Sequence, residues 1–287
     1  MARWGKLILA GLGSVGVGVG LAVWVGSARW NAKTSQLVGK LIEAIPRSGA
    51  ETISFEGFGP LPAPVAQYFR RVLREGRPMV RSVRMIQAGE FCARRVDDGW
   101  SRFEAQEYFS ARPPGFVWDA GIRMVPFMKA HTRDVYLAGQ GSMEAKILSL
   151  ITVVDERSKA ELNAGALQRY LAEAVWFPTA LLPSERVRWS PIDSRRALAT
   201  LTDSGATASL EFRFNDVGEV VSVFTPGRYR AVNGKYERTP WEGRFRNYEE
   251  REGMRIPIEG EVEWRLQDGS FPYWRGKIVE VKYDFAR

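Results

Sequence analysis

Few residues of this 287-residue chain have the types and spacing that catalysis requires. The chain has one His, His131, and one Cys, Cys92. A Ser-His-Asp or Cys-His mechanism would therefore depend on His131, which has Asp134 close in sequence but no G-x-S-x-G nucleophile motif. Cys92 would be a reactive thiol only if Arg94 and Arg95 lay close in space. An ordinary structural role is the favoured interpretation of both residues.

A second candidate for chemistry is a run of alternating carboxylates. Glu259, Glu261 and Glu263 lie at i, i+2 and i+4, which places them on one face of a strand. Such a face could perform acid/base chemistry or bind Ca²⁺. Because these glutamates alternate with Val262 and Trp264, they also fit the solvent face of a half-buried sheet. An envelope hydrolase using His131 or this face is the alternative function.

Composition excludes several other classes of site. A single Cys rules out an internal disulfide, and one His with one Cys rules out the usual zinc sites. The sequence predicts no metal and no cofactor. The 41 basic residues exceed the 33 acidic ones, but much of the excess lies in residues 1–40, which carry five basic and no acidic residues. A nucleic-acid-binding domain concentrates positive charge on its folded part, so no nucleic-acid partner is predicted.

Aromatic residues offer a third kind of site. The chain has ten Trp and fifteen Phe. Six tryptophans could line a cavity for a lipid or another apolar small molecule, although core packing explains them equally well. They are Trp118, Trp176, Trp189, Trp241, Trp264 and Trp274.

The N-terminal segment reads as a membrane anchor. Leu7–Val25 has no charge over 19 residues, which as a helix spans about 28 Å, close to the hydrocarbon core of a bilayer. Trp4 and Trp24 lie near its ends, as in an aromatic belt. We therefore predict an anchor over residues 1–33 with a helix over about 7–25. A cleaved signal peptide is the rival interpretation, but the apolar run exceeds the usual length.

Two other properties of this segment need comment. Gly11–Gly16 matches G-x-G-x-x-G, but the apolar run continues to Val25 and no acidic residue follows until Glu43, so a dinucleotide site is not favoured. Basic residues flank the run on both sides and almost balance, so charge alone does not fix the orientation. We expect a single-pass protein of the cytoplasmic membrane with an extracytoplasmic domain.

Residues 34–287 read as one α+β domain. Apolar spacing predicts helices over about 34–45, with Thr34 as the N-cap, over 62–73 and over 163–177. Arg70, Arg71 and Arg74 form a basic face on the second of these, which could lie against anionic membrane lipid or simply be solvated.

Most of the remaining chain alternates with period two. Segments 116–124, 210–214, 262–266 and 279–285 show this pattern, and turn signals such as Asn233-Gly234 separate the strands. Short strands in close succession are typical of antiparallel sheet. We predict a mostly antiparallel sheet, curved like an unclosed barrel, with about three covering helices plus the N-terminal transmembrane helix.

Several segments resemble an uncharacterised bacterial family of unknown function over about residues 59–285. They include Leu61-Pro62-Ala63-Pro64-Val65, Pro113-Pro114-Gly115-Phe116-Val117-Trp118, Trp176-Phe177-Pro178, Trp241-Glu242-Gly243-Arg244-Phe245 and Pro272-Tyr273-Trp274-Arg275-Gly276. The family implies no catalytic residue. More remotely, the order of elements is similar to periplasmic lipoprotein-carrier folds, which implies a curved sheet with helices over an apolar hollow.

These observations favour a membrane-anchored, non-enzymatic domain. It would bind or handle an apolar ligand, for example lipid, at the cell envelope, with membrane lipid as its partner. The hydrolase above and a structural or interaction protein without a cavity are the alternatives. A large cavity with apolar lining would favour the first function, and a polar cleft around His131 would favour the second.

Overall fold

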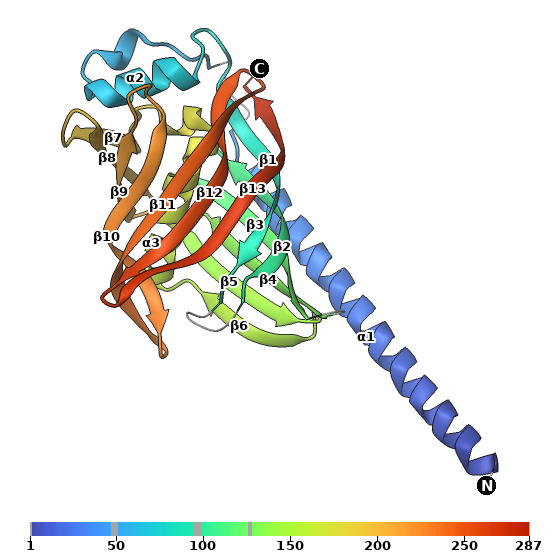
Figure 1. Ribbon diagram of the computed structural model, residues 1–287. Helices are drawn as coiled ribbons and strands as arrows, with labels where there is room; N and C mark the ends of the chain where they lie inside the picture. The colour runs from blue at the N-terminus through green and yellow to red at the C-terminus, as the bar shows by residue number, and fades with distance from the viewer. Residues whose placement is uncertain (1, 47–50, 94–98, 126–127, 287) are drawn as a thin grey trace.

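The computed structural model describes residues 2–46, 51–93, 99–125 and 128–286, with side chains from residue 18 onward. It contains three α-helices, three short 3₁₀ helices and thirteen strands in these described ranges (Figure 1). The α-helices are α1 (Ala2–Glu43), α2 (Ala63–Val72) and α3 (Ala160–Glu173), and the 3₁₀ helices are η1 (Glu56–Phe58), η2 (Ala174–Trp176) and η3 (Pro178–Leu181).

The strands fall into two groups separated by α3. The first group is β1 (Val80–Phe91), β2 (Ser101–Ser110), β3 (Gly115–Val125), β4 (Met128–Leu137), β5 (Gln140–Ile147) and β6 (Ile151–Arg157). The second group is β7 (Val187–Pro191), β8 (Arg196–Asp203), β9 (Ala206–Phe214), β10 (Val220–Val232), β11 (Lys235–Arg251), β12 (Met254–Leu266) and β13 (Gly269–Phe285).

All thirteen strands belong to one antiparallel sheet, in the order β6-β5-β4-β3-β2-β1-β13-β12-β11-β10-β9-β8-β7. Each group is a meander, and the pairing of β1 with β13 joins the two groups. The edges β6 and β7 do not pair with each other, so the sheet is an unclosed barrel. This confirms the predicted curved antiparallel sheet with covering helices.

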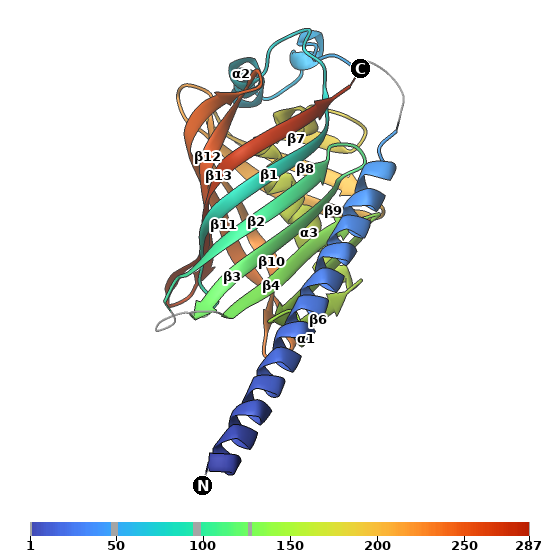
Figure 2. The ribbon, with the colours of Figure 1, turned by 90° about the vertical axis from the view of Figure 1, so that its right-hand side faces the viewer.

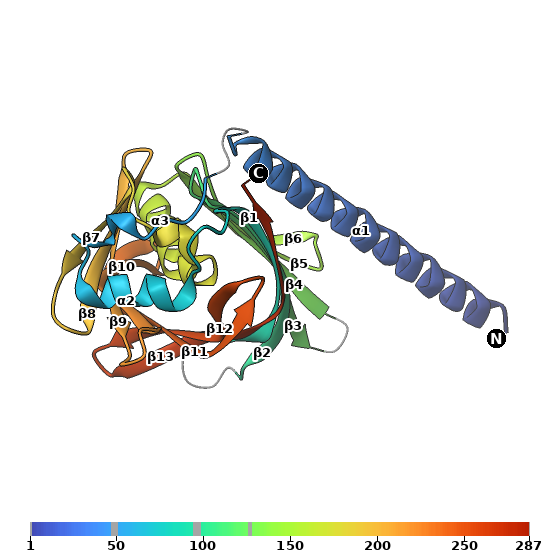
Figure 3. The same ribbon diagram turned by 90° about the horizontal axis from the view of Figure 1, so that it is seen from above.

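The concave side of the sheet holds the core. Figure 3 shows the sheet curving around α3, with α2 across one end of the hollow. Helix α3 buries Leu167, Tyr170 and Leu171, and α2 buries Tyr68 and Phe69, all within the main hydrophobic cluster. The predicted apolar spacing of both helices is therefore the face that packs against the sheet.

Helix α1 lies on the convex side and differs from the prediction. One continuous helix runs from Ala2 to Glu43, where the sequence indicated two separate helices. Its N-terminal half projects beyond the sheet, and its C-terminal half lies across the outside of the sheet (Figure 2). Thr34 is not an N-cap: its hydroxyl lies 3.3 Å from the carbonyl oxygen of Trp30 within the helix. Residues 26–33 contain no proline, so nothing interrupts the helical hydrogen bonds between the two predicted segments.

The membrane-spanning prediction falls mainly on residues with no described side chains. Within the part of the chain whose side chains are described, no helix combines the length and apolar character needed to cross a membrane. Most of the predicted span of residues 7–25 lies outside that part, because the described side chains begin at residue 18.

Candidate functional site

The six candidate tryptophans all lie in or against the main hydrophobic cluster. Trp118, Trp176 and Trp241 are buried, and Trp189, Trp264 and Trp274 are partly buried against the same cluster. Trp241 and Trp264 are cross-strand neighbours on β11 and β12. None of the six lines either of the two pockets described below. Their role in lining a ligand cavity stays a prediction.

Three of these six indoles donate a hydrogen bond within the fold. The Trp118 Nε1–H donates to Oε1 of Gln87 at 2.9 Å, and the Trp241 Nε1–H donates to the Tyr273 hydroxyl at 2.9 Å. The Trp189 Nε1–H donates to the carbonyl of Leu181 at 2.9 Å. Such contacts hold aromatic side chains in single rotamers, as expected of a packed core.

The structure does not assemble the residues proposed for a hydrolase. His131 lies on the outer side of β4, with its ring centroid 5.8 Å from that of Trp30, and burial lowers its pKa. Within the described ranges it makes no hydrogen bond to a hydroxyl or carboxylate. Cys92 is buried just after β1, and its neighbours Arg94 and Arg95 lie outside the described residues.

The three glutamates of β12 are each paired with arginine. Glu259 lies 3.2 Å from Nε of Arg246, and Glu263 lies 2.9 Å from Arg244. Glu261 lies 3.7 Å from the same Arg244. The hydrogen bond from Arg244 lowers the pKa of Glu263, so this carboxylate stays ionised rather than serving as a general acid. Glu259 and Glu261 are half-buried and Glu263 is buried, so the predicted solvent face is only partly open to water.

A buried charged cluster on the concave side was not predicted from the sequence. Arg169 of α3 donates to Glu107 and Asp134 at 2.8 Å each and to Glu173 at 2.9 Å. Burial raises the pKa of Glu107 well above its ordinary value, and repulsion from Glu173 adds to this while Arg169 opposes it. The same burial raises the pKa of Glu173. The signal was available, because Glu107 interrupts the apolar side of β2 between Ala105 and Phe109.

A pocket of about 820 Å³ lies on the convex side, between α1 and the ends of β3 and β4. Its wall combines apolar and basic side chains. The apolar ones are Val23, Trp100, Met124, Val125, Met128 and Leu148, and the basic ones are Arg102, Arg123, Lys129 and His131. Ser27, Ser101 and Ser149 complete the lining. This combination of an apolar wall and several basic side chains suits an amphiphile with an anionic head.

A buried polar cluster holds α1 against the sheet and so fixes one wall of this pocket. Arg133 of β4 has 2% of its side chain exposed, and its guanidinium carbon lies 3.9 Å from the centroid of the Trp30 ring. It donates to the Trp30 carbonyl and to the Thr34 hydroxyl at 2.8 and 2.7 Å. The Trp30 Nε1–H donates to Asp119 at 3.0 Å, and Lys33 lies 2.5 Å from Glu144.

The helix also meets the β5–β6 turn at close range. The hydroxyls of Ser27 and Ser149 are 3.2 Å apart. A Cβ atom on Gly26 would lie 2.8 Å from the carbonyl oxygen of Ser149, so only glycine permits this approach. The turn is therefore packed against α1 at the pocket.

Exposed apolar side chains surround the place where α1 leaves the sheet. Met124 and Val125 at the end of β3 are 48% and 49% exposed, and Leu150 and Ile151 of the β5–β6 turn are 43% and 61% exposed. Leu21 and Trp24 of α1 are more than half exposed. Apolar residues on adjacent segments at one end of a molecule mark an interaction surface for an apolar environment.

The predicted basic face of α2 lies elsewhere. Helix α2 is at the end of the sheet opposite to the projecting half of α1 (Figure 1). Arg74 pairs with Glu250 at 2.6 Å, Arg71 lies 4.0 Å from Glu219, and Arg70 lies over the Phe58 ring. The geometry gives no support to contact between this face and a membrane that holds α1, and such contact stays a prediction.

Two signals in the sequence pointed to the pocket without revealing it. The uncharged run Leu7–Val25 includes Val23 and ends two residues before Ser27. The second signal is the apolar pair Met124-Val125 at the end of β3. Neither signal shows that α1 folds back along β3 and β4, because a helix and a strand about 100 residues apart are brought together only by tertiary contacts.

Comparison with solved structures finds similar chains of carrier and barrel-like classes. A LolA superfamily protein from Nitrosomonas europaea is 12% identical over 77% of this chain and 92% of its own, with a TM-score of 0.41. A lipoprotein-sorting protein domain from Vibrio parahaemolyticus is 8% identical over 71% and 86%, with a TM-score of 0.40. A beta-barrel-like protein from Brucella abortus is 11% identical over 72% and 99%, with a TM-score of 0.20.

The carrier class that the sequence resembles is thus among these similar structures, and likeness at this level carries no argument about activity. A comparison with curated proteins finds no match. A model described as a family of unknown function (DUF6920) matches residues 59–283, close to the span of 59–285 on which the sequence resemblance rests. The chain therefore belongs to this family of unknown function.

Proposed function

We propose that this protein is anchored in the cytoplasmic membrane by α1, with its domain on the outer side. There it binds a lipid in the pocket between α1 and the sheet, without catalysing a reaction. One observation carries the proposal: a pocket of about 820 Å³ with an apolar wall and basic side chains is built partly from the anchor helix itself.

The position of the pocket along α1 supports this function. Val23 and Ser27 line it, and they lie at the C-terminal end of the uncharged run Leu7–Val25. If that run spans the hydrocarbon core, the pocket lies at the depth of the lipid headgroups. A lipid of the same leaflet then reaches it without leaving the interface. The exposed side chains of Met124 and Ile151 lie where the hydrocarbon begins.

The charge of the pocket favours an anionic lipid. Arg102, Arg123 and Lys129 are exposed and line it, and no carboxylate does. Within the described residues, none of these three side chains forms an ion pair. An anionic phosphate forms charge-assisted hydrogen bonds with several basic side chains. A zwitterionic headgroup is attracted less strongly to the same side chains.

The test measures lipid binding by native mass spectrometry. The full chain is mixed with dioctanoyl phosphatidylglycerol in detergent micelles and then released from the micelles. We expect one bound lipid per chain. Met124→Glu places a carboxylate in the apolar wall and should weaken binding about tenfold, because a charge in an apolar site loses its hydration. Met124 is about half exposed, so folding should tolerate the change.

Val217→Glu is the matched control. Val217 is 54% exposed in the β9–β10 turn and does not line the pocket. It should bind lipid like the unchanged chain. Equal binding by all three proteins, or no binding by any of them, would reject the pocket as a lipid site.

A further inference from the structure

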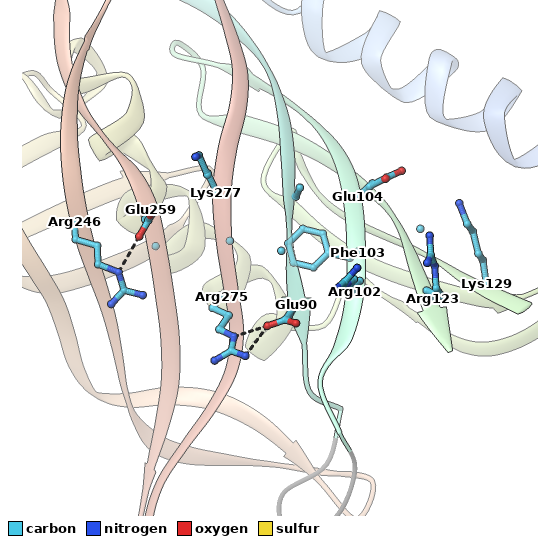
Figure 4. Close-up of a pocket in the computed structure, with 15 residues that line it drawn as sticks. Glu90, Arg102, Phe103, Glu104, Arg123, Lys129, Arg246, Glu259, Arg275 and Lys277 are labelled. Carbon is cyan, nitrogen blue, oxygen red and sulfur yellow. Dashed lines mark hydrogen bonds and ion pairs between the residues drawn. The ribbon is translucent and has the colours of Figure 1, made fainter. Parts of the chain in front are cut away.

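A second pocket of about 460 Å³ crosses the outer face of the sheet beside the first one. Figure 4 shows its side chains in a row: Lys129 and Arg123 near α1, then Arg102, and then Arg275 and Lys277 on β13 with Arg246 beyond them. We refer to this second pocket as the outer groove. It is distinct from the concave hollow, because its charged lining comes from the convex side of the strands.

The outer groove has an excess of positive charge. Six basic and three acidic residues line it, which leaves a net charge of +3. Two of the acids are neutralised locally, since Glu90 lies 2.5 Å from Arg275 and Glu259 lies 3.2 Å from Arg246. In the described part of the chain, Arg102, Arg123, Lys129 and Lys277 form no ion pair. Four basic side chains therefore remain available to an anionic ligand.

Four glycines on neighbouring strands contribute backbone to the lining of the outer groove. Gly89, Gly121, Gly260 and Gly276 all line it. A Cβ on Gly89 would lie 2.2 Å from the carbonyl oxygen of Arg275, so β1 and β13 approach each other only because glycine is there. A Cβ on Gly121 would lie 3.8 Å from Lys129 Cδ, which shows that the lysine chain lies across this glycine. A Cβ on Gly276 would lie 2.5 Å from the Trp274 ring, on the core side of the sheet, so on the outer face these glycines contribute only backbone to the groove.

The outer groove and the lipid pocket share one rim. Arg102, Arg123 and Lys129 line both pockets. The apolar wall lies on one side of these three residues, and Lys277 lies on the other. A ligand with a tail in the first pocket and a phosphate at the rim would place any extension of its headgroup in the outer groove.

We infer that the outer groove is a headgroup subsite that selects lipids carrying a second anionic group beyond the first phosphate. This rests on the proposed function, and it adds the class of ligand. The rim residues hold the phosphate nearest the acyl chains. Lys277, on β13, is a basic residue of the groove without a carboxylate partner among the described residues, and it binds the second anionic group.

The experiment compares two lipids that have the same acyl tails and differ by one phosphate. Dioctanoyl phosphatidylinositol and dioctanoyl phosphatidylinositol 4-phosphate are titrated against the full chain in detergent micelles by native mass spectrometry. We expect the second phosphate to tighten binding about tenfold, the effect of one charge-assisted hydrogen bond. Inositol 1,4-bisphosphate, which lacks the tails, should bind far more weakly than the lipid.

Lys277→Gln tests the residue. The variant should lose most of the preference for the second phosphate and keep its affinity for the one-phosphate lipid. Lys282→Gln is the control, because Lys282 lies on the same strand, is 67% exposed and does not line the outer groove. It should change neither affinity.

The outcomes separate this inference from the proposed function. If both lipids bind equally, or if Lys277→Gln weakens both alike, the headgroup subsite is wrong while lipid binding stands. If inositol 1,4-bisphosphate binds as tightly as the lipid, the groove is a free-phosphate site and the inference also fails. If neither lipid binds, the proposed function itself fails.

Discussion

At the scale of single residues, the unusual feature is the number of buried ionisable groups on both sides of the sheet. Arg169 holds three carboxylates on the concave side, and Arg133 holds α1 on the convex side. Both arginines also lie against aromatic rings, Phe116 and Trp118 for Arg169 and Trp30 for Arg133. The planar guanidinium suits such sites because it bridges several acceptors and stacks at the same time.

Glu107 makes the stability of the fold depend on pH. Its pKa in the folded chain is raised above the ordinary 4.5, so the native state holds a proton that the unfolded state releases. This contribution is fully present below about pH 4.5 and is lost as the pH rises toward the folded pKa. Glu107→Gln removes it while keeping the shape of the side chain. We expect the thermal stability of the variant to fall less steeply than that of the unchanged chain as the pH rises above about 4.5.

Thermal unfolding followed by tryptophan fluorescence at several pH values measures this slope. Glu104→Gln on the outer side of the same strand is the matched control and should behave like the unchanged chain. The raised pKa would be contradicted if the melting temperatures of the Glu107→Gln variant and the unchanged chain differed by the same amount at every pH measured.

At the scale of elements, α1 is one continuous helix that both packs on the sheet and projects beyond it. Its second half packs on β3 and β4 through Trp30 and Leu41, which are 4% and 1% exposed. No break separates this half from the projecting half, so the contacts of the second half also set the direction of the first.

A cysteine pair tests the docking of α1. Ser27→Cys with Ser149→Cys, in a Cys92→Ser background, should form a disulfide readily in the full chain, since the two hydroxyl oxygens are 3.2 Å apart. Adding Trp30→Ala removes the ring under Arg133 and its bond to Asp119, and should slow disulfide formation at least several-fold.

The control pair for this experiment is Ser35→Cys with Ser149→Cys in the same background. It should not crosslink, because residue 35 lies more than two helical turns along α1 from residue 27. Rapid crosslinking of the control pair, or no effect of Trp30→Ala on the first pair, would show that α1 is not held as described.

At the scale of the whole molecule, the apolar and basic surfaces used in the proposals lie together at one end and on one side. The pocket, the outer groove and the exposed tips of β3 and of the β5–β6 turn all adjoin the convex face near α1. The α2 face lies at the other end (Figure 1). If α1 holds the protein in a membrane as proposed, the pocket beside α1, rather than α2, faces the bilayer.

Membrane retention of the full chain tests this arrangement. We expect the chain to stay in the membrane fraction after carbonate extraction. Val15→Arg with Val19→Arg places two charges in the middle of the apolar run, each costing about 2.5–3.5 kcal/mol on insertion, and should release much of the protein. Val217→Arg with Val279→Arg adds the same charge at exposed positions of the domain and should leave retention unchanged. Recovery of the unchanged chain in the soluble fraction would reject the anchor.

Local patterns in the sequence predicted several elements of the fold. Period-two alternation identified β3, β9, β12 and β13, and apolar spacing identified α2 and α3, because these patterns record which side of an element is buried. The alternation also placed Glu259 and Glu261 on the solvent face. Turn residues such as Asn233-Gly234 located the hairpins, since glycine tolerates the required positive φ.

The positions of the charged clusters and pockets depend on tertiary contacts. The pairing of β1 with β13 joins strands almost 200 residues apart and brings Arg102 toward Lys277 in one groove. The contact of Trp30 with Arg133 holds α1 against the sheet and makes it one wall of a pocket. Such contacts depend on strand order and sheet curvature, which set the distances between residues far apart in the sequence. The period of the apolar pattern and the residue propensities act only over a few neighbouring residues, so they do not encode these distances.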